Sequence, residues 1–293
     1  MEYHYVSDKD YYFCKSIADE ICDETASYFS KKKVDLRFQD VINFLTRYLG
    51  IKEVYLFNTE NDSLVNHCIF KTLFTKNKIN LKVSDEKTIV KDIFCENVCG
   101  LTFFSEIGPM IFLNGTTTTF TRTIFTLIHE LVHCYLSFKD EQYKEKLAYM
   151  NEKVFAISAY TKEMQPTEDR TNVIASLIYI NDVALRENIE NLSWEEMRDK
   201  FGISKKALHA RLMNFFKYNF DFSKEEVKNA IWSFLYKKPE WSFYLNKMKD
   251  YELEMLNEIH EEVIADFDSE MATLVDLSDW FESEDDYKEM IFW

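Results

Sequence analysis

Glycine and proline are scarce in this chain, with 5 and 3 copies in 293 residues. Both residues dominate tight turns, so their scarcity argues against a sheet-rich fold with many hairpins and favours helices. No apolar run approaches the roughly 20 residues that a membrane-spanning helix needs. Residues 1–8 also lack the basic segment and apolar run of a signal peptide. We therefore expect a cytoplasmic protein that makes no contact with a membrane.

Cysteines are few and scattered. Of the six, Cys95 and Cys99 lie close together, and no second pair accompanies them, so the spacing argues against a zinc knuckle. In a cytoplasmic protein such cysteines are mostly reduced core residues. Hydrophobic residues make up 46% of the chain and aromatic residues 16%, which predicts a folded protein with a sizeable core.

Positively charged residues are almost absent from the C-terminal segment. Residues 250–293 contain 16 acidic residues and one basic residue, Lys288, whereas the preceding 249 residues contain 35 acidic and 34 basic residues. A near-neutral body is therefore followed by a strongly acidic tail. Phosphates repel such a tail, so its charge argues against direct nucleic-acid binding and favours a basic partner.

Hydrophobic periodicity predicts an α+β fold that is rich in helices and has a small sheet. We expect helices near residues 11–30 and 34–49, a strand at 52–57, one or two strands within 69–83, and paired strands at 98–104 and 109–115. Helices follow at about 121–138, 147–160 and 171–187, and a helix-turn-helix covers residues 194–216. We expect one domain over residues 1–220 and a helical, acidic region over residues 221–293.

The predicted helix at 121–138 contains the motif His129-Glu130-Leu131-Val132-His133. On a helix, His129 and His133 lie one turn apart and point the same way, so both imidazoles can bind one Zn²⁺. Glu130 lies between them, where it can serve as general base toward a water molecule at the metal. This pattern predicts a metallohydrolase site.

A catalytic zinc site needs a third protein ligand and an open position. Glu152, on the predicted helix at 147–160, follows His133 after 18 intervening residues. This spacing, with an asparagine immediately before the glutamate, resembles that of gluzincin peptidases, in which a second helix brings a carboxylate to the zinc. Glu141 and Glu145 are alternative ligands.

The order of several motifs resembles the ImmA/IrrE family of metallo-endopeptidases. The similar segments are a strand ending in Asn114, the Phe-Thr-Leu-x-His-Glu-Leu-x-His run at 125–133, a Phe-Ala step at 155–156, and a Phe-Gly-Ile-Ser segment beginning at Phe201. They lie within residues 11–220, and the acidic C-terminus is outside them. The family places its third ligand where Asn151 stands, so the choice between Glu152, Asn151, Glu145 and Glu141 stays open.

The resemblance implies a zincin-like, zinc-dependent endopeptidase whose substrate is one specific protein. In this family the substrate is typically a DNA-binding repressor in a phage, mobile-element or stress-response circuit. His129, His133 and Glu152 would hold the metal, and Glu130 would be catalytic. Two alternatives remain. One is a non-enzymatic interaction protein whose acidic C-terminus binds a basic partner or mimics DNA, and the other is a component of a toxin–antitoxin or phage-defence pair.

Overall fold

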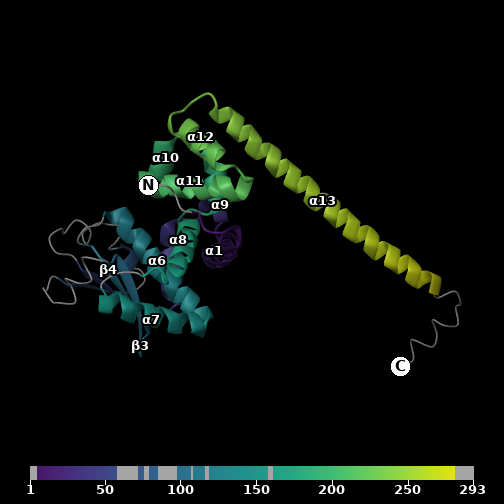
Figure 1. The fold of residues 1–293 in the computed structure, drawn as a ribbon. Helices are drawn as coiled ribbons and strands as arrows, with labels where there is room; N and C mark the ends of the chain where they lie inside the picture. The colour runs from purple at the N-terminus through teal and green to yellow at the C-terminus, as the bar shows by residue number, and fades with distance from the viewer. Residues whose placement is uncertain are drawn as a thin grey trace. The chain divides into compact units, whose positions relative to one another are not determined.

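The computed structural model describes residues 5–57, 72–75, 79–84, 98–106, 108–115, 119–157 and 161–280. The chain is an α+β protein in which helices predominate around one small mixed sheet (Figure 1). It divides into two compact units, Met1–Leu235 and Tyr236–Trp293. Among the described helices, none is both long enough and apolar enough to cross a membrane.

The sheet has four strands in the order β2-β1-β4-β3. Their bounds are Glu53–Phe57 for β1, Asn80–Ser84 for β2, Gly100–Ser105 for β3 and Gly108–Asn114 for β4. β1 is parallel to both of its neighbours, and β3 and β4 form an antiparallel hairpin in which Ser105 faces Gly108. The predicted pairing of residues 98–104 with 109–115 is confirmed. In the predicted region 69–83, residues 72–75 are helical and only β2 is a described strand.

Ten longer helices are described along the chain, and the first unit contains nine of them. The bounds are Asp8–Phe29 (α1), Phe38–Tyr48 (α2), Phe120–Lys139 (α6), Glu141–Ile157 (α7), Gln165–Tyr179 (α8), Asp182–Ile189 (α9), Trp194–Phe201 (α10), Lys205–Phe220 (α11), Lys224–Leu235 (α12) and, in the second unit, Trp241–Trp280 (α13).

The predicted single helix at 171–187 is wrong, because two helices share this region. α8 begins earlier, at Gln165, since Pro166 is tolerated in the first turn of a helix. It ends at Tyr179, and the side chain of Asn181 then accepts a hydrogen bond from the backbone N–H of Ala184 and starts α9. The sequence pattern missed this asparagine cap between two apolar segments.

The predicted helix-turn-helix is confirmed in α10 and α11. Ser193 caps α10 in a reciprocal bond with Glu196, and Gly202 ends it with φ of 61°, a conformation that glycine adopts without strain. Ser204 then caps α11 by accepting from the N–H of Ala207. Because α11 contains a long run of buried side chains, this unit is packed into the body of the protein.

Helix α6 lies in the middle of the first unit. One side of it packs against β3 and β4, and another packs against α8, which in turn packs against α1 (Figure 1). From Ile124 to Tyr135 nearly every side chain is buried. Polar groups in this segment must therefore find partners within the protein, because water cannot solvate them.

Candidate metal centre

Two buried histidines on α6 converge at their Nε2 atoms. His129 and His133 are 8% and 2% exposed, and their Nε2 atoms lie 3.0 Å apart. Two nitrogens bound to one tetrahedral Zn²⁺ at about 2.05 Å lie roughly 3.3 Å apart. The helix therefore already holds the two imidazoles close to the separation that a shared metal ion requires.

Glu168, in the first turn of α8, adds a carboxylate to this pair. Its Oε2 lies 3.1 Å from Nε2 of His129, and its Oε1 lies 3.4 Å from Nε2 of His133. One ligand atom from each of the three residues lies within 4.8 Å of the other two. This His-His-Glu cluster can hold a metal ion, and its donor set of two imidazoles and one carboxylate is one that metallopeptidases use.

A chain of hydrogen bonds fixes the tautomer of His133. The hydroxyl of Thr171 donates to the carbonyl oxygen of Thr167 at 3.0 Å, so it accepts from the Tyr143 hydroxyl at 3.3 Å. Tyr143 in turn accepts from Nδ1 of His133 at 2.8 Å. The ring proton of His133 is therefore on Nδ1, and the lone pair of Nε2 is left for a metal.

Asn172 fixes the tautomer of His129 in a similar way. Its Oδ1 lies 3.0 Å from Nδ1 of His129, which donates to it. Both histidines thus direct Nε2 lone pairs at one point, where a negative carboxylate also arrives. Either a metal ion or protons on Nε2 must offset the repulsion between these donor atoms, so the arrangement makes the cluster a candidate metal site.

The pKa values in the cluster follow from the same contacts. With no metal bound, burial alone would raise the pKa of Glu168, but hydrogen bonds with the imidazoles of His129 and His133 hold it far below its usual range. Burial lowers the pKa of His129, and the hydrogen bond and charge of Glu168 outweigh this and raise it. The carboxylate is therefore charged at neutral pH, and the site favours a positive occupant.

Glu130 faces β3 on a different side of α6. It is 3% exposed, and its Oε2 accepts a hydrogen bond of 2.8 Å from the hydroxyl of Thr102. Burial raises the pKa of Glu130, and the nearby imidazoles of His129 and His133 only partly offset this. A carboxylate with a raised pKa is a stronger base, which is what a group that accepts a proton from water requires.

Gly100, at the start of β3, makes room for this carboxylate. A Cβ atom at this position would lie 2.6 Å from Oε1 of Glu130 and 2.5 Å from Cγ2 of Thr126. Any larger residue would push the strand away from α6 or displace the glutamate. The close approach of strand and helix therefore depends on this glycine.

The residues considered as third ligand from the sequence lie on α7. Asn151 is buried and donates to the carbonyl oxygen of Thr102 at 2.6 Å, so its amide supports β3. Glu141 pairs with Lys144 at 2.8 Å, and Glu145 is exposed. The side chain of Glu152 lies outside the described residues, and the metal cluster found among the described residues contains Glu168.

Sequence reasoning overlooked Glu168, Asn172 and Tyr143. A signal for the first two was present, because Glu168 and Asn172 are four residues apart, the same spacing as His129 and His133. Pro166 just before them marks a helix start, so both would lie on one face of that helix. Tyr143 carried no such signal, since only the packing of α7 brings its hydroxyl to His133.

Helices α6 and α8 run antiparallel with matching turns. His133 meets Glu168, and one turn earlier on α6 His129 meets Asn172, one turn later on α8. Further along the same two helices, the rings of Phe125 and Tyr179 lie 6.4 Å apart. The metal cluster is therefore one end of a longer line of contacts between these helices.

The fold and the site define a helix-borne His-Glu-x-x-His centre that is completed by a carboxylate from an antiparallel helix. No family model, curated protein or solved structure matches this chain significantly. The resemblance to the ImmA/IrrE peptidases rests on the sequence motifs alone and stays a prediction.

Proposed function

We propose that the protein is a zinc-dependent endopeptidase. The observation that carries the proposal is the convergence of Nε2 of His129, Nε2 of His133 and the carboxylate of Glu168, with Glu130 directly after the first ligand. Three protein ligands leave a position for substrate or water, as in catalytic zinc sites. Zinc bound there supplies a Lewis acid that polarises a peptide carbonyl and activates water.

In this proposal Glu130 moves the proton. Thr102 donates to its Oε2 and keeps the carboxylate pointing in one direction, and Oε1 accepts the proton of the attacking water. Glu130 then gives this proton to the leaving amine. Its buried position raises its pKa toward the working range of a general acid and base.

The roles of Tyr143 and Asn172 follow from their hydrogen bonds. Each accepts the Nδ1 proton of one histidine, so each holds a ring in the orientation that presents Nε2. They position the ligands and make no contact with substrate in this scheme.

Metal content and cleavage by one variant test the proposal. A natural candidate substrate, by the family resemblance, is a DNA-binding repressor encoded by a neighbouring gene. The zinc-loaded protein should cut this repressor, and Glu130→Gln should bind zinc equally well and cut at least about 100-fold more slowly. Glu145→Gln, an exposed site on α7, is the matched control. Cleavage by Glu130→Gln at the wild-type rate would exclude this mechanism.

A second candidate function concerns the acidic helix α13. Between Asp250 and Glu262 there is no lysine or arginine, and Leu253, Leu256 and Ile259 are 59%, 63% and 55% exposed. We propose that this surface binds a basic, amphipathic segment of a partner protein. Exposed apolar side chains supply contact area, and the acids supply attraction that weakens with salt.

This partner hypothesis has its own test. The repressor should bind the wild-type protein less tightly as salt rises, and deletion of residues 250–293 should remove this salt dependence. Replacing Leu253 and Leu256 by alanine should weaken binding at every salt concentration. If the deletion left both affinity and salt dependence unchanged, α13 would not be the docking element.

A further inference from the structure

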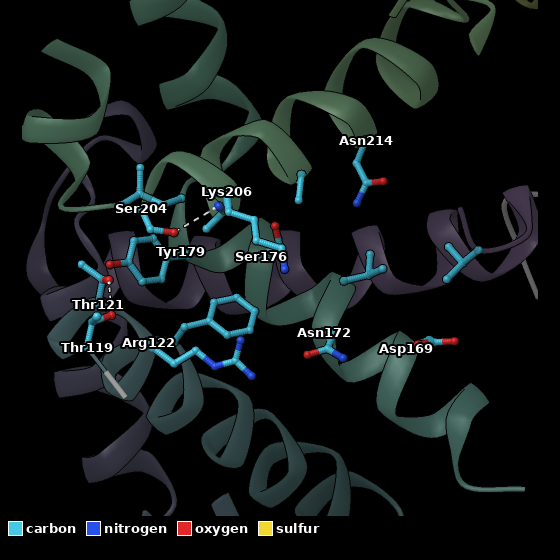
Figure 2. Close-up of a pocket in the computed structure, with 16 residues that line it drawn as sticks. Thr119, Thr121, Arg122, Asp169, Asn172, Ser176, Tyr179, Ser204, Lys206 and Asn214 are labelled. Atoms are coloured by element: carbon cyan, nitrogen blue, oxygen red, sulfur yellow. Dashed lines mark hydrogen bonds between the residues drawn. The ribbon is translucent and has the colours of Figure 1, made fainter. Parts of the chain in front are cut away.

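A cavity of about 370 Å³ lies between α6, α8 and the first half of α11 (Figure 2). This volume is within the usual range of ligand-binding pockets, and it is large enough for one or two amino-acid side chains. All of its lining residues belong to the first unit of the chain. It is therefore a feature of the same body that holds the metal centre.

The cavity and the metal centre share one residue, Asn172. Asn172 lines the cavity and also accepts the Nδ1 proton of His129 at 3.0 Å. Phe125, one turn before His129 on α6, and Ser176, one turn after Asn172 on α8, line it as well. The line of contacts between the two helices thus runs from the metal cluster to the lining of the cavity, so the cavity adjoins the candidate metal centre.

The lining combines an apolar wall with two cations. Phe125 and Ile203 contribute apolar surface, and Arg122 and Lys206 contribute positive charge from α6 and α11. Arg122 donates a hydrogen bond of 3.3 Å to the thiol of Cys99, a weak acceptor, and neither cation forms an ion pair with a described residue. Figure 2 shows the guanidinium of Arg122 reaching along the cavity toward Asn172.

Among the described residues that line the cavity, Asp169 is the one acid. Asp169 accepts a hydrogen bond of 2.7 Å from the amide of Gln165, in the first turn of the same helix. Arg122 and Lys206 outnumber Asp169, so the described lining has a net positive charge in a protein whose net charge is −16. An anionic group would find two cations and apolar surface together, a combination that a neutral or basic group would not match.

We propose that this cavity is a substrate subsite for a bulky apolar residue next to an acidic residue. The apolar side chain packs on Phe125 and Ile203, and the carboxylate pairs with Arg122 and Lys206. Arginine can hold a carboxylate with two parallel hydrogen bonds, which gives the pairing direction as well as strength. The assignment of a substrate segment rests on the proposed peptidase function, whereas the preference for an acidic peptide is a property of the cavity itself.

Binding of fluorescein-labelled peptides to the zinc-loaded Glu130→Gln protein tests the proposal without cleavage. Three seven-residue peptides differ at one position, Phe-Glu, Phe-Gln or Phe-Lys, and fluorescence anisotropy measures each affinity. The Phe-Glu peptide should bind about 10-fold more tightly than the other two, the effect of one charge-assisted hydrogen bond. Equal binding of all three peptides, or no binding, would overturn the proposal.

Substitutions of Arg122 and Lys206 test whether these two cations cause the preference for the Phe-Glu peptide. Arg122→Gln and Lys206→Gln should each remove most of the preference for Phe-Glu, and Arg122→Glu should shift the preference to Phe-Lys. Lys205→Gln is the matched control, because Lys205 is also exposed at the start of α11 but does not line the cavity. A preference that survives in both Gln variants would place the acidic peptide elsewhere.

These experiments distinguish failure of the subsite proposal from failure of the proposed peptidase activity. If the Phe-Glu preference maps to Arg122 and Lys206 while the wild-type protein cuts nothing, the subsite stands and the proposed activity fails. If the protein cuts its repressor at the same rate in the Arg122→Gln and Lys206→Gln variants, the activity stands and the subsite fails. Thermal melting of both variants checks that these exposed substitutions leave the fold intact.

Discussion

The hydroxyl of Tyr143 accepts a hydrogen bond of 2.8 Å from Nδ1 of His133 and donates its own to the hydroxyl of Thr171. A residue on α7 thereby determines which nitrogen of a histidine on α6 is free to bind metal. Removing the hydroxyl leaves Nδ1 of a buried ring without its acceptor, so the tautomer and the orientation of the ring are no longer fixed.

We predict that Tyr143→Phe weakens zinc binding by about 10- to 100-fold, the usual effect of losing such a partner. Competition with a chelating dye measures the affinity. Tyr149→Phe on the same helix is the control, since its ring is 51% exposed, and it should bind zinc like the wild type. Equal affinities for both variants would show that the hydrogen bond does not orient the ligand.

Glu168→Gln should abolish stoichiometric zinc binding. The substitution keeps the shape of the side chain but removes the charge that faces Nε2 of His129 and His133. Metal analysis after dialysis measures the loss. Glu152→Gln is the informative comparison, and it should retain zinc. The opposite pattern, loss with Glu152→Gln and retention with Glu168→Gln, would restore Glu152 as the third ligand.

Gly100→Ala should destabilise the protein by about 1–3 kcal/mol, as overpacking in a tight core usually does. Its Cβ would lie 2.5 Å from Cγ2 of Thr126 and 2.6 Å from Oε1 of Glu130. Adding Thr126→Ser removes the first contact and should recover much of the stability, measured by urea unfolding. Activity should stay low in the double variant, because the contact with Glu130 remains. Recovery of activity together with stability would mean that Gly100 does not position the base.

A buried ion cluster should control the stability of the body in acid. Arg211 is completely buried, its Nε donates to the carbonyl oxygen of Ile180 at 2.9 Å, and it pairs with Asp182, which also binds Lys15 at 2.5 Å. Asp182→Asn leaves the arginine buried without its counter-charge and should cost about 3–5 kcal/mol. Asp19→Asn, which removes only the more exposed partner of Lys15, should cost less than about 1 kcal/mol.

The pH dependence of this cluster has a defined sign. Burial raises the pKa of Asp182, but the charges of Arg211 and Lys15 outweigh this and lower it from 3.8 to about 2. The unfolded chain therefore binds the proton first, so the contribution of roughly 2 kcal/mol is complete above about pH 4 and is lost as the pH falls toward 2. The difference in unfolding free energy between wild type and Asp182→Asn should shrink over this interval. A constant difference would argue against the shifted pKa.

Local patterns predicted much of the fold. The helix that carries His129 and His133, the hairpin of β3 and β4, and the helix-turn-helix of α10 and α11 all depend on residues within a few positions of one another. Such features can be predicted from the sequence because they depend on interactions between residues that are close in the chain. The split between α8 and α9 was missed, since one capping asparagine outweighed a continuous apolar pattern.

The completion of the site depends on distant residues. Glu168 is 35 positions after His133, and only the packing of α8 against α6 brings them together. Spacing along the sequence indicated Glu152 instead, because it lies on the helix that directly follows His133. Tyr143 and Thr102 reach the centre through α7 and β3 in the same way. Sequence spacing describes one helix well, but it does not determine which other elements pack against that helix.

A metal ion held by residues of both α6 and α8 would also be a cross-link between these helices. The ion would join two points of the chain with α7 between them, so its binding energy adds to the stability of the native state by mass action. At a free zinc concentration 100 times the dissociation constant, this linkage amounts to about 2.7 kcal/mol. Zinc supply would then set both the activity of such a protein and the fraction of it that escapes unfolding and degradation in the cell.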